Sequence, residues 1–97
     1  MKTKQEYINI LTTNAETLRN RFGIKSLMLF GSVARDEQHE GSDVDVFVEM
    51  PPSIFTEMAA REYLENVLQS PVDLVRRHNQ LRALFTQRIE NDGIRIF

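Results

Sequence analysis

Residues 27–48 restrict the possible folds more than any other part of the chain. They read L-M-L-F-G-S-V-A-R-D-E-Q-H-E-G-S-D-V-D-V-F-V, two short apolar runs that flank a longer polar stretch. Short apolar runs that are bounded by glycine and rich in β-branched and aromatic residues are typical of strands. We therefore expect buried strands at residues 26–30 and 44–48, joined by a polar loop that begins at Gly31.

The N-terminal segment has the pattern of an amphipathic helix. Thr3 and Glu6 fit a capping box, in which each side chain accepts a hydrogen bond from the backbone N–H of the other residue. Apolar residues then recur at helical spacing until Gly23, a residue type that commonly ends helices. The sequence therefore predicts one continuous helix over residues 4–22 that packs on the sheet.

The second half of the chain continues the alternation of helices and strands. Pro51-Pro52 interrupt the chain, and Ser53 is a suitable N-cap for the next helix. The expected elements are a helix at about 54–68, a strand at 72–75, a helix at about 80–91 and an edge strand at 94–97. The residues expected to face inward are Phe55, Ala59, Tyr63 and Val67 in the first helix, and Leu81, Leu84, Phe85 and Ile89 in the second. This order predicts the α/β (α+β) class, with a small mixed β-sheet flanked by helices.

The composition limits the chemistry available to the chain. Of its 97 residues, 41% are hydrophobic and 27% are charged, which predicts one small domain, residues 1–97, that an oligomer or a partner chain would help to stabilise. Because cysteine is absent, we expect oxygen ligands at any metal site. The net charge of −2 argues against a dedicated DNA-binding protein. No apolar run approaches the roughly 20 residues of a membrane span, and the N-terminus has no apolar signal core, so we expect a cytoplasmic protein without membrane contact.

Gly31 and Ser32 follow the first expected strand and have the features of a phosphate-binding turn. A glycine lets the backbone approach a ligand closely and adopt a positive φ angle. The following N–H groups, in a short helix expected from Ser32, would point at an anion, and the serine hydroxyl adds a donor. A glycine–serine pair after a strand also occurs in ordinary turns, so these two residues alone do not decide between the two interpretations.

Three aspartates form a candidate metal site. Asp43 and Asp45 project to the same face of a strand, where two carboxylates repel each other unless a cation lies between them. Asp73 interrupts the third short strand, where an acidic residue is costly unless it is paired or bound to metal. If the two strands are neighbours, three carboxylates converge and can hold two divalent ions. The alternative is that Asp43 caps a turn and that Asp45 and Asp73 are solvated.

The combined motifs resemble those of a known family. G-S-V-A-R, then S-D-V-D-V-F-V, then an aspartate in V-D-L-V are similar to the motifs of the minimal nucleotidyltransferases (MNT) of the DNA polymerase β superfamily. The resemblance covers nearly the whole chain and implies a nucleotidyltransferase fold, ATP as substrate, and two Mg²⁺ ions, with Mn²⁺ as an alternative. Small members of this length are typically the MNT antitoxin of a HEPN/MNT toxin–antitoxin pair, which implies a HEPN-domain toxin as partner.

The resemblance also implies a role for each matching residue. The residues that would hold the nucleotide are Gly31, Ser32 and Arg35, and those that would bind metal and act in catalysis are Asp43, Asp45 and Asp73. Asp73 would in addition help to deprotonate the attacking hydroxyl. One position departs from the pattern, because many relatives have glycine where this chain has Asp36. An ion pair of Arg35 with Asp36 or Glu37 is an equal alternative to its contact with substrate.

Three functions follow from these residues. The first is transfer of AMP from ATP to a tyrosine of a HEPN toxin, which would make the chain a type VII antitoxin. The second is a binding module that neutralises a partner by contact alone, and the third is nucleotidyl transfer to a small molecule or RNA. The basic cluster Arg76, Arg77, His78 and Arg82 would contact phosphate or a partner, or simply be solvated.

Overall fold

A four-stranded mixed sheet forms the centre of the molecule, with strand order β3-β2-β1-β4. The computed structural model describes residues 2–97. Its strands are β1 (Ser26–Phe30), β2 (Val44–Glu49), β3 (Val72–Arg76) and β4 (Ile94–Arg95). β1 pairs with β2 and β4 in antiparallel fashion, and β2 pairs with β3 in parallel, so β3 is an edge strand. The predicted α/β class and mixed sheet are confirmed.

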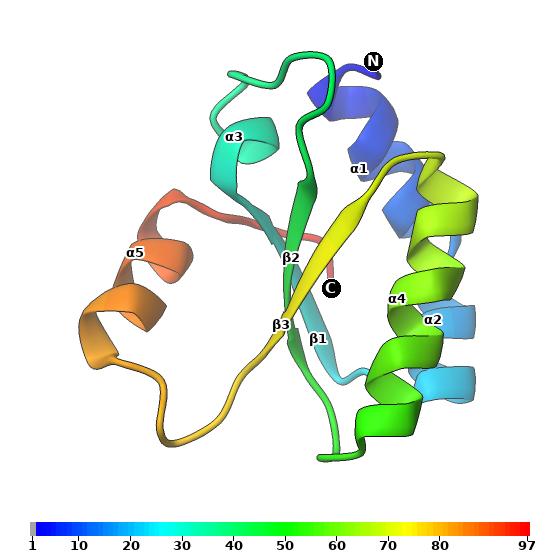
Figure 1. Cartoon of the computed structure of the whole chain (residues 1–97), viewed down its shortest axis with the longest axis vertical. Coiled ribbons are helices and arrows are strands. Elements are labelled where there is room, and N and C mark those ends of the chain that lie inside the picture. The colour runs from blue at the N-terminus through cyan, green and yellow to red at the C-terminus, as the bar shows by residue number, and fades with distance from the viewer. Residues whose placement is uncertain (1) are drawn as a thin grey trace.

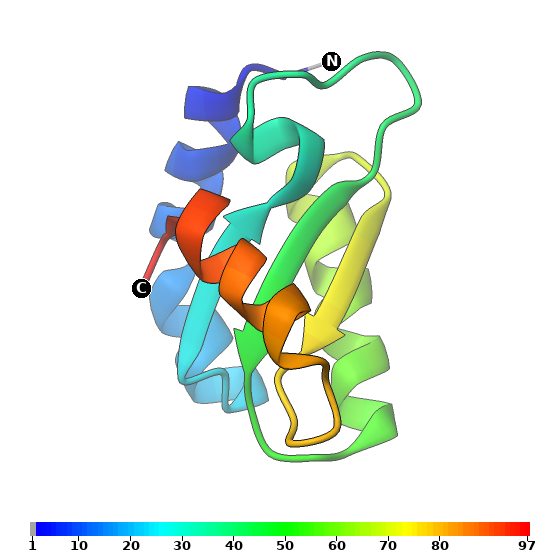
Figure 2. The same ribbon diagram turned by 90° about the vertical axis from the view of Figure 1, so that its left-hand side faces the viewer.

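Five helices lie on the two faces of the sheet. They are α1 (Lys4–Thr13), α2 (Ala15–Phe22), α3 (Gly31–Ala34), α4 (Ile54–Leu68) and α5 (Ala83–Asp92). In Figure 1, α1, α2 and α4 cover one face and α5 lies on the other. Figure 2 shows α5 crossing β1 and β2 while the beginnings of β2 and β3 stay uncovered. No helix within residues 2–97 has the length and apolar character needed to cross a membrane.

β2 shows how the core is placed. Val44, Val46 and Val48 are fully buried in the cluster under α1, α2 and α4, together with Leu27 and Leu29 of β1. Successive side chains of a strand point to opposite faces, so the residues between these valines face α5. The main hydrophobic core is thus on one side of the sheet, and the other side combines the apolar contacts of α5 with polar groups.

The predicted single helix over residues 4–22 is wrong, because the chain breaks at Asn14 into α1 and α2. The Asn14 side chain donates to the carbonyl of Ile10 (2.8 Å) and accepts from the Tyr63 hydroxyl (2.5 Å), which compensates the interrupted helical bonding. The capping box is confirmed, since Thr3 and Glu6 exchange both predicted hydrogen bonds.

The predicted inward face of α4 is wrong in its first two turns. Its buried residues are Ala60, Leu64 and Leu68, whereas Phe55 is 82% exposed. The buried stripe is displaced by one residue, about 100° around the helix, from the predicted stripe, and Tyr63 and Val67 stay partly buried at its side. In α5, which begins at residue 83 rather than 80, Ile89 is buried as expected but Leu84 is 63% exposed.

Candidate active site

Asp45 and Asp73 lie side by side across neighbouring strands. The registers pair Phe30 of β1 with Asp45 of β2, and Asp45 with Asp73 of β3, which makes one row across the sheet. Neighbouring strands are about 4.8 Å apart, so the two carboxylates occupy adjacent positions on the face that α5 leaves open. Asp43 precedes β2 and is exposed. The structure therefore brings together Asp45 and Asp73, which the sequence placed in separate segments.

The turn after β1 is in contact with this row. Gly31 has a φ angle of 74° and begins α3. A Cβ atom at Gly31 would overlap the Asp45 carboxylate, lying 2.9 Å from its Cγ and 3.2 Å from its Cβ. A glycine is thus required both for the backbone angle and for the close approach to Asp45. Ser32 follows it in α3 and is half-buried. The predicted phosphate turn therefore lies against Asp45, one of the predicted metal ligands.

Hydrogen bonds fix the loops that lead into β2 and β3. The backbone N–H of Val44 donates to the carbonyl of Pro71 (2.8 Å), which ties the two loops together. Ser42 is buried, its N–H donates to the carbonyl of His39 (2.9 Å), and its Oγ accepts from the N–H of His39 (3.0 Å). These bonds hold the turn at residues 39–42 that precedes Asp43.

The surroundings of Asp45 disfavour the charged form of its carboxyl group. Burial raises the pKa of the Asp45 carboxyl, and the negative charges of Asp73 and Asp43 raise it further, while Arg35 acts in the opposite direction. The charge of Asp45 is therefore unfavourable in the folded chain by itself. A cation among these carboxylates would relieve that repulsion.

The oxygen donors of these residues are of the type that suits the metal implied by the resemblance. Carboxylate oxygens are the ligands that Mg²⁺ and Mn²⁺ prefer, and two of the carboxylates occupy one row. Within residues 2–97, no three acidic or histidine side chains are grouped tightly enough to hold a metal ion as they stand. The assignment of Asp43, Asp45 and Asp73 as a set of metal ligands stays a prediction.

Arg35 and Asp36 end the short helix α3. The Arg35 Nε donates to Glu37 Oε1 at 2.6 Å, the ion pair that was the alternative to a nucleotide contact, and both side chains are exposed. Asp36 has a φ angle of 61°, in the left-handed region that glycine adopts without strain. The glycine that the family pattern has at this position therefore has a structural reason, and aspartate is one of the residues that best tolerate the same angle.

An aromatic cluster next to the carboxylates was missed in the sequence. The ring of Phe30 packs edge-on against Phe47 (centroids 6.5 Å apart) and against Phe85 (6.3 Å). The cluster anchors α5 on β1 and β2 beside Asp45. The signal was present for Phe47, which alternates with the core valines of β2 and so belongs to the α5 face.

The basic cluster after β3 is divided between the two faces of the sheet. Arg76 pairs with Glu57 of α4 (3.6 Å), whereas Arg77 pairs with Glu90 of α5 and lies over the Phe47 ring. These contacts attach two helices to the sheet. Both arginines therefore take part in ion pairs within the chain, a role that the sequence did not predict for this cluster.

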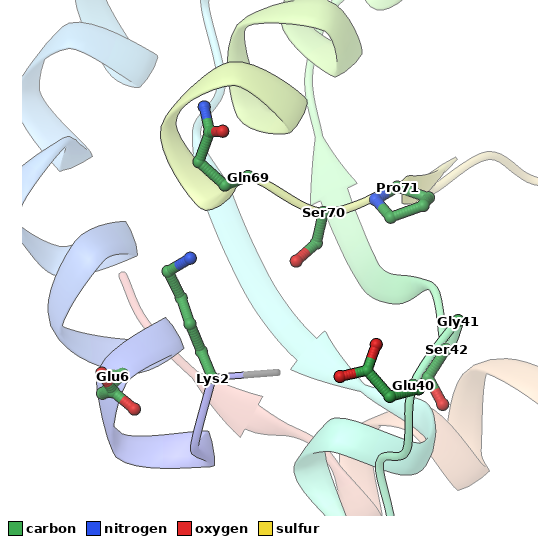
Figure 3. A pocket seen from close by; sticks show the side chains of 8 residues that line it. All are labelled: Lys2, Glu6, Glu40, Gly41, Ser42, Gln69, Ser70 and Pro71. Carbon is green, nitrogen blue, oxygen red and sulfur yellow. The ribbon is translucent and has the colours of Figure 1, made fainter.

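A polar pocket of about 390 Å³ lies at the end of the sheet where the chain enters β2 and β3, as Figure 3 shows. Its walls are Lys2, Glu6, Glu40, Gly41, Ser42, Gln69, Ser70 and Pro71. Ser70 in its wall is hydrogen-bonded to the buried Tyr7 of α1 (2.9 Å). None of Asp43, Asp45 and Asp73 lines this pocket, although Ser42 in its wall directly precedes Asp43.

Comparison with known proteins gives one consistent family. Residues 13–97 match the family described as Polymerase beta, Nucleotidyltransferase. The protein adenylyltransferase MntA of Thermococcus cleftensis is 43% identical over 77 residues, which cover 77% of this chain and 78% of that protein.

Solved structures show the same fold. A protein assigned as a minimal nucleotidyltransferase superposes with a TM-score of 0.79 at 24% identity, over 96% of this chain and 95% of the other. One chain of the complex between a tri-AMPylated HEPN toxin of Shewanella oneidensis and an MNT antitoxin matches with a TM-score of 0.67 at 18% identity, over 98% of this chain and 72% of the matched chain.

Proposed function

Because this chain belongs to the polymerase β family of nucleotidyltransferases, we propose that it transfers AMP from ATP to a tyrosine hydroxyl of a HEPN-domain toxin and thereby acts as its antitoxin. The observation that carries the proposal is the row of Asp45 and Asp73 in contact with Gly31. The name protein adenylyltransferase of the Thermococcus relative and the AMPylated HEPN toxin in the Shewanella complex support the choice of nucleotide and acceptor.

In this proposal each predicted site residue has a defined task. Gly31 and Ser32 hold the β- and γ-phosphates of ATP. Asp43, Asp45 and Asp73 would hold two Mg²⁺ ions, which when bound would supply positive charge for the phosphates and make the attacking hydroxyl easier to deprotonate. Asp73 accepts the hydroxyl proton. The tyrosine oxygen then bonds to the α-phosphorus, the bond from that phosphorus to the β-phosphate oxygen breaks, and pyrophosphate leaves.

Label transfer tests this proposal directly. The wild-type chain is incubated with ATP labelled at the α-phosphate, Mg²⁺ and the HEPN-domain toxin that the proposal names as acceptor, which is to be sought in the adjacent reading frame. We expect label on the HEPN protein from the wild-type chain and none from Asp43→Asn or Asp45→Asn. Replacement of the acceptor tyrosine by phenylalanine should also remove the label. Absence of label with the wild-type chain would exclude the proposed reaction.

Toxicity in cells separates catalysis from contact. If AMP transfer silences the toxin, Asp45→Asn fails to restore growth although it still binds the toxin. Full rescue by Asp45→Asn would instead assign neutralisation to contact alone.

A further inference from the structure

The proposed reaction sets the direction from which the acceptor approaches. In an in-line transfer the attacking hydroxyl enters opposite the leaving pyrophosphate. With the pyrophosphate on Gly31 and Ser32 after β1, and the α-phosphorus over Asp45 of β2, the hydroxyl must enter from beyond Asp73 of β3. The sheet order places β3 at the edge, and no strand of residues 2–97 pairs with its outer side. This step rests on the proposed function.

The outer edge of β3 carries a hollow next to Asp73. Leu74 follows Asp73 and points to the opposite face of the sheet, towards α4. Together with Ile54, Met58 and Arg61 it lines a shallow hollow of about 170 Å³. Asp73 and the hollow therefore lie on opposite faces of the same edge strand. Leu74, which lines the hollow, directly follows Asp73 in the chain.

The hollow has the composition of a protein-binding surface. Ile54 is 68% exposed and Met58 is 57% exposed, although both are large apolar side chains. Glu57 lies at its rim and is held by Arg76 at 3.6 Å, while Arg61 adds a positive charge. Adjacent exposed apolar residues with a polar rim are typical of interaction sites, and the rim arginine favours an acidic group on the partner.

We infer that the acceptor protein docks on the free edge of β3, with an apolar side chain in the hollow formed by Ile54, Met58 and Leu74 and an acidic neighbour at Arg61. A partner held there reaches around the strand edge to Asp73, so docking presents the acceptor hydroxyl to the carboxylate row. The hollow thus selects the protein that is modified, whereas the row performs the transfer.

Binding of the HEPN-domain toxin that the proposed function names as acceptor tests the inference. The variant Ile54→Ser/Met58→Ser keeps the Ser53 cap and changes only exposed side chains. We expect calorimetry to show at least a tenfold higher Kd for the HEPN protein, and label transfer to show a higher KM for it with kcat nearly unchanged. Leu84→Ser is the matched control, since Leu84 is 63% exposed on α5, and its Kd should stay within twofold of wild type.

The outcomes separate this inference from the proposed function. Normal Kd and KM in the Ile54→Ser/Met58→Ser variant would overturn the docking site while leaving AMP transfer intact. Tight binding that the variant weakens, without any label transfer by the wild-type chain, would support the docking site and exclude the reaction. A wild-type chain that does not bind the HEPN protein overturns the docking site. A wild-type dimer that the variant dissociates, measured by light scattering, would show that a second copy occupies the hollow and would also overturn it.

Discussion

The two faces of β2 differ in what their side chains contribute. Towards α1, α2 and α4, the strand presents Val44, Val46 and Val48, none of which is exposed to solvent. Towards α5 it presents Asp45 and Phe47. Asp45 lies beside Asp73 of β3. One face is a closed apolar core, and the other places negative charges next to one another where ligands can reach them.

This difference shows how a small domain can carry an unfavourable site. Domains are only marginally stable, so clustered charges must be offset elsewhere. Here the offset is on the opposite face of the same strand, where burial of apolar side chains stabilises the sheet that positions the carboxylates. We therefore expect substitutions on the open face to change activity and substitutions on the closed face to change stability.

The largest expected effect is on the open face. Asp45→Asn should lower kcat/KM for AMP transfer about a thousandfold, comparable to the loss of other essential polar groups in active sites. Its Tm in the absence of metal should equal or exceed that of the wild type, because the substitution removes repulsion from Asp73 and Asp43. Label-transfer kinetics and thermal unfolding measured on the same sample test both statements. A large loss of Tm would contradict the separation between the two faces.

The closed face should give the opposite result. Leu64 of α4 is fully buried in the core. Leu64→Ala should lower the free energy of unfolding by about 2–5 kcal/mol, since it removes buried methyl groups and leaves a cavity. At a temperature where the variant is still folded, kcat/KM should stay within about twofold of wild type. Chemical denaturation and label transfer measure the two quantities, with the exposed Leu84→Ala as control.

Much of this architecture could be predicted from short sequence signals. The strand at residues 26–30 and its terminating Gly31 were placed correctly, because a short apolar run ending in glycine has few alternatives. The pairing of Asp45 with Asp73 required only that two predicted strands be neighbours. Local patterns of this kind suffice where the structure depends on residues close together in the chain.

Other features depend on contacts that no local pattern contains. The break at Asn14 is stabilised by Tyr63, which is 49 residues further along the chain. The exposure of Phe55 depends on how α4 rotates against the sheet. The contact of Phe30 with Phe85 requires α5 to fold back over β1. Each of these belongs to tertiary packing, and two of them determine which surfaces are left for a ligand or a partner.

The close contact between Gly31 and Asp45 can be tested by comparing substitutions at two glycines. Gly31 and Gly41 both have positive φ angles, 74° and 84°, but a Cβ atom would overlap the Asp45 carboxylate at Gly31 and meet nothing within 4 Å at Gly41. Gly41→Ala should cost about 1–2 kcal/mol from backbone strain alone, and Gly31→Ala more than that. Denaturant unfolding measures both. Adding Asp45→Ala should recover part of the loss in Gly31→Ala and none in Gly41→Ala.

The smallest expected effect is the pH dependence of stability, for which Asp45 and Glu6 have opposite signs. The pKa of Asp45 is raised above its ordinary value of 3.8, chiefly by burial, so the folded state binds this proton more tightly than the unfolded state. Stability contributed by Asp45 therefore falls as the pH rises from 3.8 through the raised pKa. The pKa of Glu6 is lowered from 4.5 by its hydrogen bonds with Thr3, so its contribution is present above 4.5 and is lost as the pH falls through the lowered pKa.

Thermal unfolding of metal-free protein between pH 3 and pH 7 separates these two contributions. The Tm of Asp45→Asn minus that of the wild type should become more positive as the pH rises, because only the wild type acquires the unfavourable charge. The Tm of Glu6→Gln minus that of the wild type should become more negative over the same range, because only the wild type gains the charged cap. Parallel curves for both variants would mean that the carboxylate row is not electrostatically strained, and the contrast between the open and closed faces would then be one of exposure alone.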